Sequence, residues 1–301
     1  MKFSLNRLVK GFLFIACFIA VERFCHKKTE GFRVHKILSS LPFNPHLETP
    51  ALTKEELHQV EAILTQPFYF LGSGGQCYAF LSEDKAVVLK VFKHHHMRPT
   101  SFIDNLPLPP ILDKLRNENI DRRKKRLLYI LGSVKISAEE LKEETGVIYA
   151  HLNKTPDVFN KKITLHDKLF IKHLIDVDSL EFVLQKRADL TYPTLNALLK
   201  NNESEAAKRC IDSLLTLILT RNQKGIADND PVIDRNFGYI GEKAVEIDLG
   251  SFSKDPRLKD PVFCKEELLS ETEKFSEWIE AHHPSLTPYL NEKLKIYTQD
   301  K

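Results

Sequence analysis

Residues 228–252 read DNDPVIDRNFGYIGEKAVEIDLGSF, a stretch in which Asp228 and Asp230 are followed by Asn236 and then by Asp248, two residues before a glycine. Asp248 follows the short apolar segment AVEI, so it stands at the end of a predicted strand. A carboxylate beside a glycine is common in a plain turn. Carboxylate and amide oxygens are also the ligands that Mg²⁺ prefers in proteins. The stretch therefore fits either a turn or a magnesium-phosphate site, and the rest of the chain has to decide between them.

A glycine-rich turn lies far upstream, in residues 71–93, which read LGSGGQCYAFLSEDKAVVLKVFK. At Gly72, Gly74 and Gly75, backbone N–H groups can approach phosphate oxygens without obstruction by a side chain. Lys90 stands in the middle of the β-branched strand AVVLKVF, whose apolar neighbours predict a strand covered on both faces. A lysine in such a strand needs a partner, and nucleotide phosphates would supply one. The alternatives are an ordinary hairpin turn and a lysine on a solvated face.

Taken together, these segments resemble a protein-kinase-like fold over roughly residues 66–252. LGSGGQCYAFL resembles the glycine-rich loop, and VVLKVF resembles the strand that carries the phosphate-anchoring lysine, here Lys90. NFGYI resembles the segment after the catalytic-loop asparagine, here Asn236, and EIDLG resembles the motif whose aspartate, here Asp248, holds magnesium. EFVLQKRADL, which contains Gln185, resembles the last N-lobe strand and the hinge where adenine would stack. The resemblance implies ATP and Mg²⁺ as cofactors.

Two site residues implied by the resemblance remain open. The catalytic loop has no HRD triplet, and Asp230 precedes Asn236 by six residues where the family usually has five. We favour Asp230 as the catalytic carboxylate and keep Asp228 as the alternative. The glutamate that would pair with the phosphate-anchoring lysine is Glu144 or Glu140, both on a long predicted helix.

The resulting fold class is α+β, with a bilobal kinase-like arrangement. Residues 66–190 would form a β-rich N-lobe with one long helix, and residues 191–301 a compact α-rich C-lobe. Residues 29–65 predict a linker followed by a helix, where Thr53 and Glu56 have the spacing of a capping box. Only about fifty residues follow DLGSF, so the chain would be a compact, divergent bacterial member of the family.

The first 28 residues differ from the rest of the chain. Basic residues up to Lys10 precede an uncharged apolar run from Gly11 to Val21, a pattern typical of an export signal or a short signal-anchor. The run is shorter than the roughly 20 residues that a spanning helix needs. This predicts a membrane-associated or exported protein, with a buried N-terminal helix as the alternative. The basic run RRKKR at 122–126 would be a solvated helix face or a contact with anionic lipid.

Composition excludes one class of partner. The chain has 301 residues, 42% hydrophobic and 28% charged, which suits a globular protein. Its net charge of +3 gives no strong attraction to nucleic acid.

Three functions remain. The first is an Mg-dependent phosphotransferase that acts on a hydroxyl of an unknown acceptor, protein or small molecule. The second is a membrane-tethered pseudokinase that serves as a scaffold, and the third is a structural protein without a ligand. The first two require Lys90 and Asp248 to lie close together across a cleft.

Overall fold

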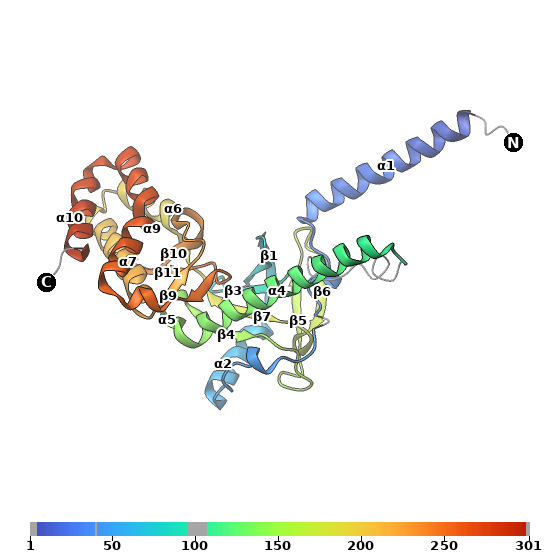
Figure 1. Cartoon of the computed structure of the whole chain (residues 1–301), viewed down its shortest axis with the longest axis horizontal. Helices are drawn as coiled ribbons and strands as arrows, with labels where there is room; N and C mark the ends of the chain where they lie inside the picture. The colour runs from blue at the N-terminus through green and yellow to red at the C-terminus, as the bar shows by residue number, and fades with distance from the viewer. Residues whose placement is uncertain (1–4, 40, 95–106, 299–301) are drawn as a thin grey trace.

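The computed structural model describes residues 5–39, 41–94 and 107–298, and it has an α+β fold built on a mixed seven-stranded sheet (Figure 1). In space the strands follow the order β4-β7-β3-β2-β1-β5-β6. All neighbours pair antiparallel except β1 and β5, which are parallel. The strands of this sheet are β1 (Pro67–Ser73), β2 (Cys77–Ser82), β3 (Val87–Phe92), β4 (Val147–His151), β5 (Lys162–His166), β6 (Lys172–Asp176) and β7 (Phe182–Lys186).

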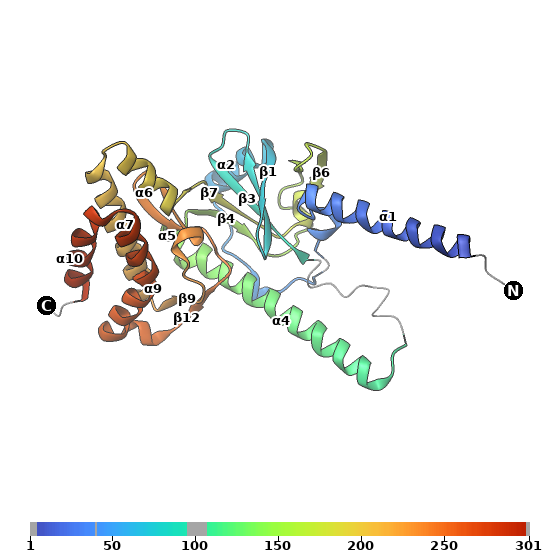
Figure 2. The same cartoon turned by 90° about the horizontal axis from the view of Figure 1, so that it is seen from above.

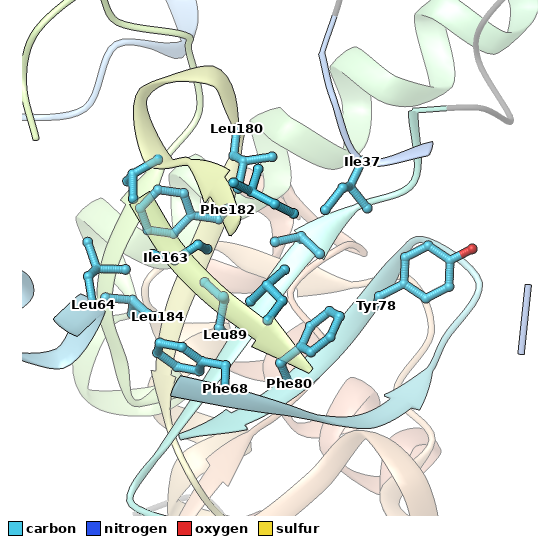
Figure 3. Packing of buried hydrophobic residues seen from close by; sticks show 14 of the residues in the cluster. Ile37, Leu64, Phe68, Tyr78, Phe80, Leu89, Ile163, Leu180, Phe182 and Leu184 are labelled. Atoms are coloured by element: carbon cyan, nitrogen blue, oxygen red, sulfur yellow. The ribbon is translucent and has the colours of Figure 1, made fainter. Parts of the chain in front are cut away.

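Strand β3 lies between β2 and β7, inside the sheet. Five of its side chains are buried, and Lys90 is partly buried among them, which confirms the prediction of a strand covered on both faces. Apolar residues of β1, β2, β3, β5 and β7 form a buried core beside it, as Figure 3 shows for Phe68, Phe80, Leu89, Ile163 and Phe182. The sheet therefore fixes the position of Lys90 on well-packed backbone.

The chain before the sheet forms α1 (Leu5–Thr29), short 3₁₀ turns η1 (Val34–Lys36) and η2 (Pro45–Leu47), and α2 (Lys54–Thr65). The predicted capping box is confirmed, because Thr53 Oγ1 accepts from the Glu56 N–H at 3.2 Å and Glu56 Oε2 accepts from the Thr53 N–H at 2.9 Å. Phe32 and Ile37 are buried in the sheet core, so the predicted linker is in part a packed segment.

Helix α1 projects away from the body of the molecule (Figures 1 and 2). Its side chains from Val9 to Lys28 are exposed, which contradicts the alternative of a buried N-terminal helix. Within the part of the chain that the structure describes, no helix combines the length and the apolar character needed to cross a membrane.

The long predicted helix is present as α4 (Pro110–Glu140), followed after Leu141 by α5 (Lys142–Thr145). Gly146 ends it with a left-handed backbone, φ +65°, a conformation that favours glycine. One face of the second half of α4 packs against β4 and against residues 249 and 252, in a buried cluster between the large sheet and the C-terminal helices.

The C-terminal part is mostly helical and has its own buried core. Its helices are α6 (Thr191–Lys200), α7 (Ser204–Gln223), α8 (Ile233–Asn236), α9 (Pro261–His282) and α10 (Thr287–Thr298), with the 3₁₀ turns η5 (Pro256–Lys259) and η6 (Pro284–Leu286). A further 3₁₀ turn, η4 (Val177–Ser179), connects β6 to β7 in the large sheet. Two small sheets accompany the C-terminal helices, β11-β10-β8 and β12-β9. Their strands are β8 (Asp189–Leu190), β9 (Ile226–Asp228), β10 (Phe237–Ile240), β11 (Lys243–Glu246) and β12 (Phe252–Lys254).

A close backbone approach explains the glycine of NFGYI. Gly238 on β10 pairs with Leu190 on β8, and a Cβ atom at Gly238 would lie 2.5 Å from the carbonyl oxygen of Asp189. Only glycine lets these strands meet at this distance. The β10–β11 hairpin, which ends just before Asp248, is thereby fixed against the strand that leaves the large sheet.

Candidate functional site

The side chain of Lys90 reaches from β3 to the segment that carries Asp248. Its Nζ atom donates a hydrogen bond to the carbonyl oxygen of Ile247. Burial lowers the pKa of Lys90, and the nearby Cys77 and Asp248 side chains partly oppose that shift. The structure thus brings Lys90 and Asp248 together, as the sequence analysis required of a phosphate site.

The peptide group of Ile247 links this lysine to the catalytic-loop candidates. Its N–H donates to the carbonyl oxygen of Asn236 at 2.6 Å, while its carbonyl oxygen accepts from Lys90. The amide Nδ2 of Asn236 in turn donates to the carbonyl oxygen of Asp230 at 2.7 Å. Lys90, Ile247, Asn236 and Asp230 therefore form one continuous chain of hydrogen bonds, and Asp248 is joined to it covalently.

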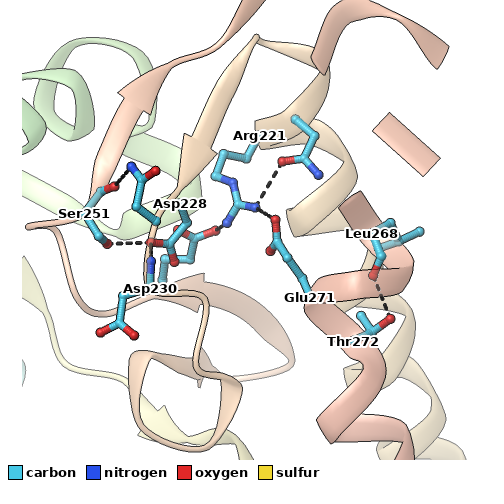
Figure 4. A network of polar contacts seen from close by, with 10 residues as sticks. Arg221, Asp228, Asp230, Ser251, Leu268, Glu271 and Thr272 are labelled. Carbon is cyan, nitrogen blue, oxygen red and sulfur yellow. Dashed lines mark hydrogen bonds and ion pairs between the residues drawn. The ribbon is translucent and has the colours of Figure 1, made fainter. Parts of the chain in front are cut away.

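The two candidate catalytic aspartates have different environments (Figure 4). Asp228 is buried, and its Oδ1 accepts from Ser251 Oγ at 2.5 Å and from the Asp230 N–H at 2.9 Å. Burial raises the pKa of Asp228, and the guanidinium of Arg221 partly offsets this. The side chain of Asp230 is about half exposed. Asp228 therefore positions the loop, and Asp230 is the carboxylate that an incoming molecule can reach.

A hollow of about 870 Å³ opens beside Asp230. One wall is the loop of residues 229–235, and the other is α9 together with Tyr192, whose ring stacks on Trp278 at 3.9 Å between centroids. Most of its lining residues are polar or charged, with the two aromatic rings on one side, and concave sites are the usual places where small molecules bind. An acceptor hydroxyl could reach Asp230 from this hollow.

The glycine turn, residues 72–76 at the junction of β1 and β2, lies against the segment that follows Asp248. The side chain of Gln76 packs directly on Gly250. A Cβ atom at Gly250 would lie only 1.7 Å from Gln76 Oε1, so no larger residue fits there without a shift of Gln76. Lys93 Nζ holds the turn in place by donating to Ser73 Oγ at 2.7 Å and to the carbonyl oxygen of Gly74. The space between the turn and the Asp248 segment is thus filled by Gln76 in this structure.

The three turn glycines are not explained by the fold itself. None of Gly72, Gly74 and Gly75 is among the glycines with positive φ. A Cβ atom would meet nothing within 4 Å at Gly72 or Gly75, and at Gly74 only the Cys77 carbonyl oxygen at 3.8 Å. Each position would accept a larger residue here, so close approach by another molecule is a physical reason for glycine at these positions.

The predicted glutamate partner of Lys90 is wrong. Glu144 pairs with Lys224 at 2.5 Å, and Glu140 pairs with Lys254. The helix breaks at Leu141, which has φ −124°, and cations of the C-terminal part meet both carboxylates. Neither glutamate therefore pairs with Lys90, and the contact of α4 with the Asp248 segment is made by Ser133.

Ser133, which the sequence analysis missed, joins α4 to the segment after Asp248. Its Oγ atom donates to the carbonyl oxygen of Leu249 at 2.6 Å and accepts from the N–H of Phe252 at 2.7 Å. Tyr129 OH, also on α4, donates to the carbonyl oxygen of Ser251 at 3.0 Å. The helix therefore holds residues 249–252 through two hydroxyl groups and backbone atoms.

The prediction that Gln185 binds a cofactor is also corrected. This side chain is buried, and its Nε2 donates to the carbonyl oxygens of Thr145 at 2.7 Å and Glu246 at 3.1 Å. A β-bulge between Val147 and Tyr149 shifts the register of β4 against β7 beside it. Gln185 thus joins α5, β7 and β11 as a structural bridge, with both amide hydrogens already engaged.

A buried ionic network, also absent from the sequence analysis, lies behind the site (Figure 4). Arg221 on α7 is fully buried and donates to Glu246 at 2.5 Å, to Glu271, and to Asn222 at 3.0 Å. Glu246 ends β11 and Glu271 lies on α9. One guanidinium therefore ties the strand before Asp248 to two C-terminal helices.

The network predicts a loss of stability as pH rises. Burial raises the pKa of Glu246 from 4.5 to about 8, and the attraction of Arg221 offsets only part of that rise. The folded state then holds a proton that the unfolded state releases near pH 4.5, so the free energy of unfolding falls as pH rises from about 4.5 to about 8. Burial also raises the pKa values of Glu271 and Asp228, which adds to the same slope.

Urea denaturation between pH 6 and 9 measures this slope. Glu246→Gln keeps the acceptor oxygen for Arg221 without a titrating group, so its profile should be flatter than that of the wild type. Glu242→Gln is the control, because Arg209 lowers the pKa of the exposed Glu242. A wild-type stability that stays constant or rises over this range would contradict the prediction.

The oxygen atoms at the site suit a hard cation carried by phosphates. Asp248 and Asn236 offer one carboxylate and one amide, and Mg²⁺ commonly takes one or two protein carboxylates plus phosphate and water oxygens. Across residues 5–39, 41–94 and 107–298, no group of three or more His, Cys, Asp or Glu side chains could hold a metal ion by itself. Neither a scan against protein-family models nor a search of curated proteins finds a match to this chain.

Proposed function

We propose that the protein is a divergent kinase-like phosphotransferase that uses ATP and Mg²⁺ to phosphorylate a hydroxyl group. The observation that carries the proposal is the hydrogen-bonded chain from Lys90 through Ile247 and Asn236 to Asp230. Residues from β3, the catalytic loop and the DLG segment meet there in the combination that phosphoryl transfer uses. The five antiparallel strands β1-β2-β3-β7-β4 beside α4 support the bilobal interpretation.

Each residue has one role in the proposal. Lys90 leaves the Ile247 carbonyl oxygen and pairs with the nucleotide phosphates, while backbone N–H groups of the glycine turn face the phosphate oxygens. Asp248 and Asn236 would hold Mg²⁺, which supplies charge neutralisation at the transferred phosphoryl group. Asp230 orients the acceptor hydroxyl and takes its proton. Gln76 has to move aside before the phosphates can enter.

Ligand-induced stabilisation tests the nucleotide site. We expect ATP with Mg²⁺ at a hundred times its dissociation constant to add roughly 2.7 kcal/mol to the free energy of unfolding. Asp248→Ala should remove the part that depends on Mg²⁺, and Lys90→Ala should remove most of the effect. Lys162→Ala, at an exposed position of β5, is the control and should keep it. Absence of any shift in the wild type would reject nucleotide binding and leave the ligand-free structural protein.

A pseudokinase is the second candidate, and two observations favour it. Both candidate glutamates are paired with lysines other than Lys90, and Gln76 fills the space above Gly250. Such a protein would bind ATP and show the same ligand-induced increase in the free energy of unfolding, but it would not consume the nucleotide. Release of ADP over time, measured with purified protein, separates the two candidates.

A further inference from the structure

We propose that the protein binds an anionic lipid bilayer by inserting exposed apolar side chains of α1 and of the β5–β6 hairpin. The exposed apolar side chains of these two elements together are called the membrane-binding surface. Nine large apolar side chains on α1 are 48–73% exposed. They are Val9, Phe12, Leu13, Phe14, Ile15, Phe18, Ile19, Val21 and Phe24. At 100° per residue they surround the helix, and a helix that is apolar on all sides is normally buried in protein or in lipid.

The β5–β6 hairpin carries a second apolar group at its tip. Leu169, Phe170 and Ile171 are 50%, 75% and 53% exposed, and Lys168 and Lys172 flank them. Phe170 has φ +62°, a left-handed backbone that bulky residues rarely adopt. Among the residues that the structure describes, no packing contact explains a strained turn that displays a phenylalanine to solvent.

The tip is held rigidly by the buried Asp167. Its Oδ1 accepts from the backbone N–H groups of Leu169 at 2.9 Å and Ile171 at 3.0 Å, and its Oδ2 faces His173 Nε2 at 3.0 Å. These bonds fix the turn before any partner arrives. The three apolar side chains are therefore presented together, with little conformational entropy left to lose on binding.

Direct contacts join the hairpin to the base of α1. Lys168 Nζ pairs with Glu30 Oε1 at 2.5 Å, one residue after α1 ends. The rings of Phe32 and His173 meet edge to face at 5.6 Å. The hairpin tip therefore lies at the base of α1, from which the apolar residues of the helix project.

Basic residues accompany this surface. The five consecutive side chains of residues 122–126 on α4 are exposed, as are Lys10, Lys27 and Lys28 on α1. In both views α1 and the first half of α4 extend from the same end of the long axis, away from α9 and α10 (Figures 1 and 2). Positive charge and exposed apolar groups on elements that extend toward the same end match the anionic headgroups and acyl chains of a bilayer.

A bilayer fits this surface better than a protein partner does. A groove on a protein covers one face of a helix, whereas the apolar residues of α1 point in every direction. Lipid chains can surround such a helix, and lysines at the edge of the apolar region can reach the headgroups. Two linked insertions also give more durable attachment than one.

Vesicle flotation of the full chain tests the proposal. We expect binding to phosphatidylcholine vesicles that contain about 30% phosphatidylserine, and much weaker binding without it. The triple variant Leu169→Ser, Phe170→Ser, Ile171→Ser should lower the partition coefficient about tenfold or more. Val262→Ser, Leu269→Ser, Ile296→Ser removes three equally exposed apolar side chains from the C-terminal helices, and it should bind like the wild type.

Two further variants make the result specific. Arg122→Gln, Arg123→Gln, Arg126→Gln should lower the partition coefficient on the anionic vesicles about 100-fold, roughly fivefold for each residue. Phe170→Trp should show a blue-shifted emission on these vesicles that the single native tryptophan, Trp278, does not show. Equal binding without anionic lipid, unchanged binding of the serine variant, or a concentration-dependent dimer that does not bind vesicles would overturn the proposal.

Discussion

Asp230→Asn is expected to lower the rate of phosphoryl transfer by about 10²–10⁴-fold, the usual contribution of a positioned general base. Asp230 is the more exposed of the two candidate aspartates and stands beside the hollow. Its carbonyl oxygen, which the substitution keeps, accepts from Asn236. The loop should therefore stay folded, and the stabilisation by ATP with Mg²⁺ should remain close to that of the wild type.

Two other aspartate variants separate catalysis from structure. Asp157→Asn, at an exposed position in the loop after β4, should leave the rate unchanged. Asp228→Asn keeps the Oδ1 atom that accepts from Ser251 Oγ and from the Asp230 N–H, so it should leave both the stability and the rate close to those of the wild type. Kinetics of ATP consumption, with thermal denaturation of each variant, measure both effects. A full rate for Asp230→Asn together with a lost rate for Asp228→Asn would reverse the assignment.

Arg221→Met is expected to lower the free energy of unfolding by about 3–5 kcal/mol. Methionine fills a similar volume, but it leaves the Glu246 and Glu271 carboxyls buried without their cation. Both side chains are at most 2% exposed, so neither can reach water to compensate. The effect should increase as pH rises, since each carboxyl then has to ionise without a partner.

Equilibrium unfolding in urea measures this effect, and Arg209→Met serves as its matched control. Arg209 makes two hydrogen bonds of 2.7 Å to Glu242 on the exposed surface. Solvent screens such a pair, so its loss should lower the free energy of unfolding far less than the loss of Arg221 does. Adding Glu246→Gln and Glu271→Gln to Arg221→Met should recover much of the loss by removing the unpaired charges. An equal loss in the two arginine variants would contradict the account of the network.

Local features of the sequence predicted much of the fold. Thr53 and Glu56 lie within one helical turn, so their capping box depends on no distant part of the chain. The glycine at 146 ends α5 for an equally local reason. The apolar run around Lys90 predicted a covered strand, and the DLG segment lies beside that lysine. These patterns depend on short-range geometry and on burial, both of which are visible in sequence.

The sequence did not show which side chains pair with partners that lie far away along the chain. Glu140 and Glu144 pair with lysines 114 and 80 residues away, so the partner of each one depends on how distant parts of the chain pack together. The hydrogen bonds of Gln185 likewise depend on carbonyl groups of two other elements, α5 and β11, which the sequence does not place beside it.

A usable signal did exist for Arg221. It lies on the same stripe of α7 as Ile211, Leu214 and Ile218, which are fully buried. An arginine at the spacing of a buried stripe predicts a buried ion pair.

The position of Gln76 has a consequence for affinity. The Gln76 side chain lies against Gly250, so under the proposed function only molecules in which this side chain has swung away would be competent to receive a nucleotide. The apparent dissociation constant then equals the intrinsic one divided by the fraction of open molecules. A kinase-like protein closed in this way would respond only to high nucleotide concentrations, unless another event had already opened the turn.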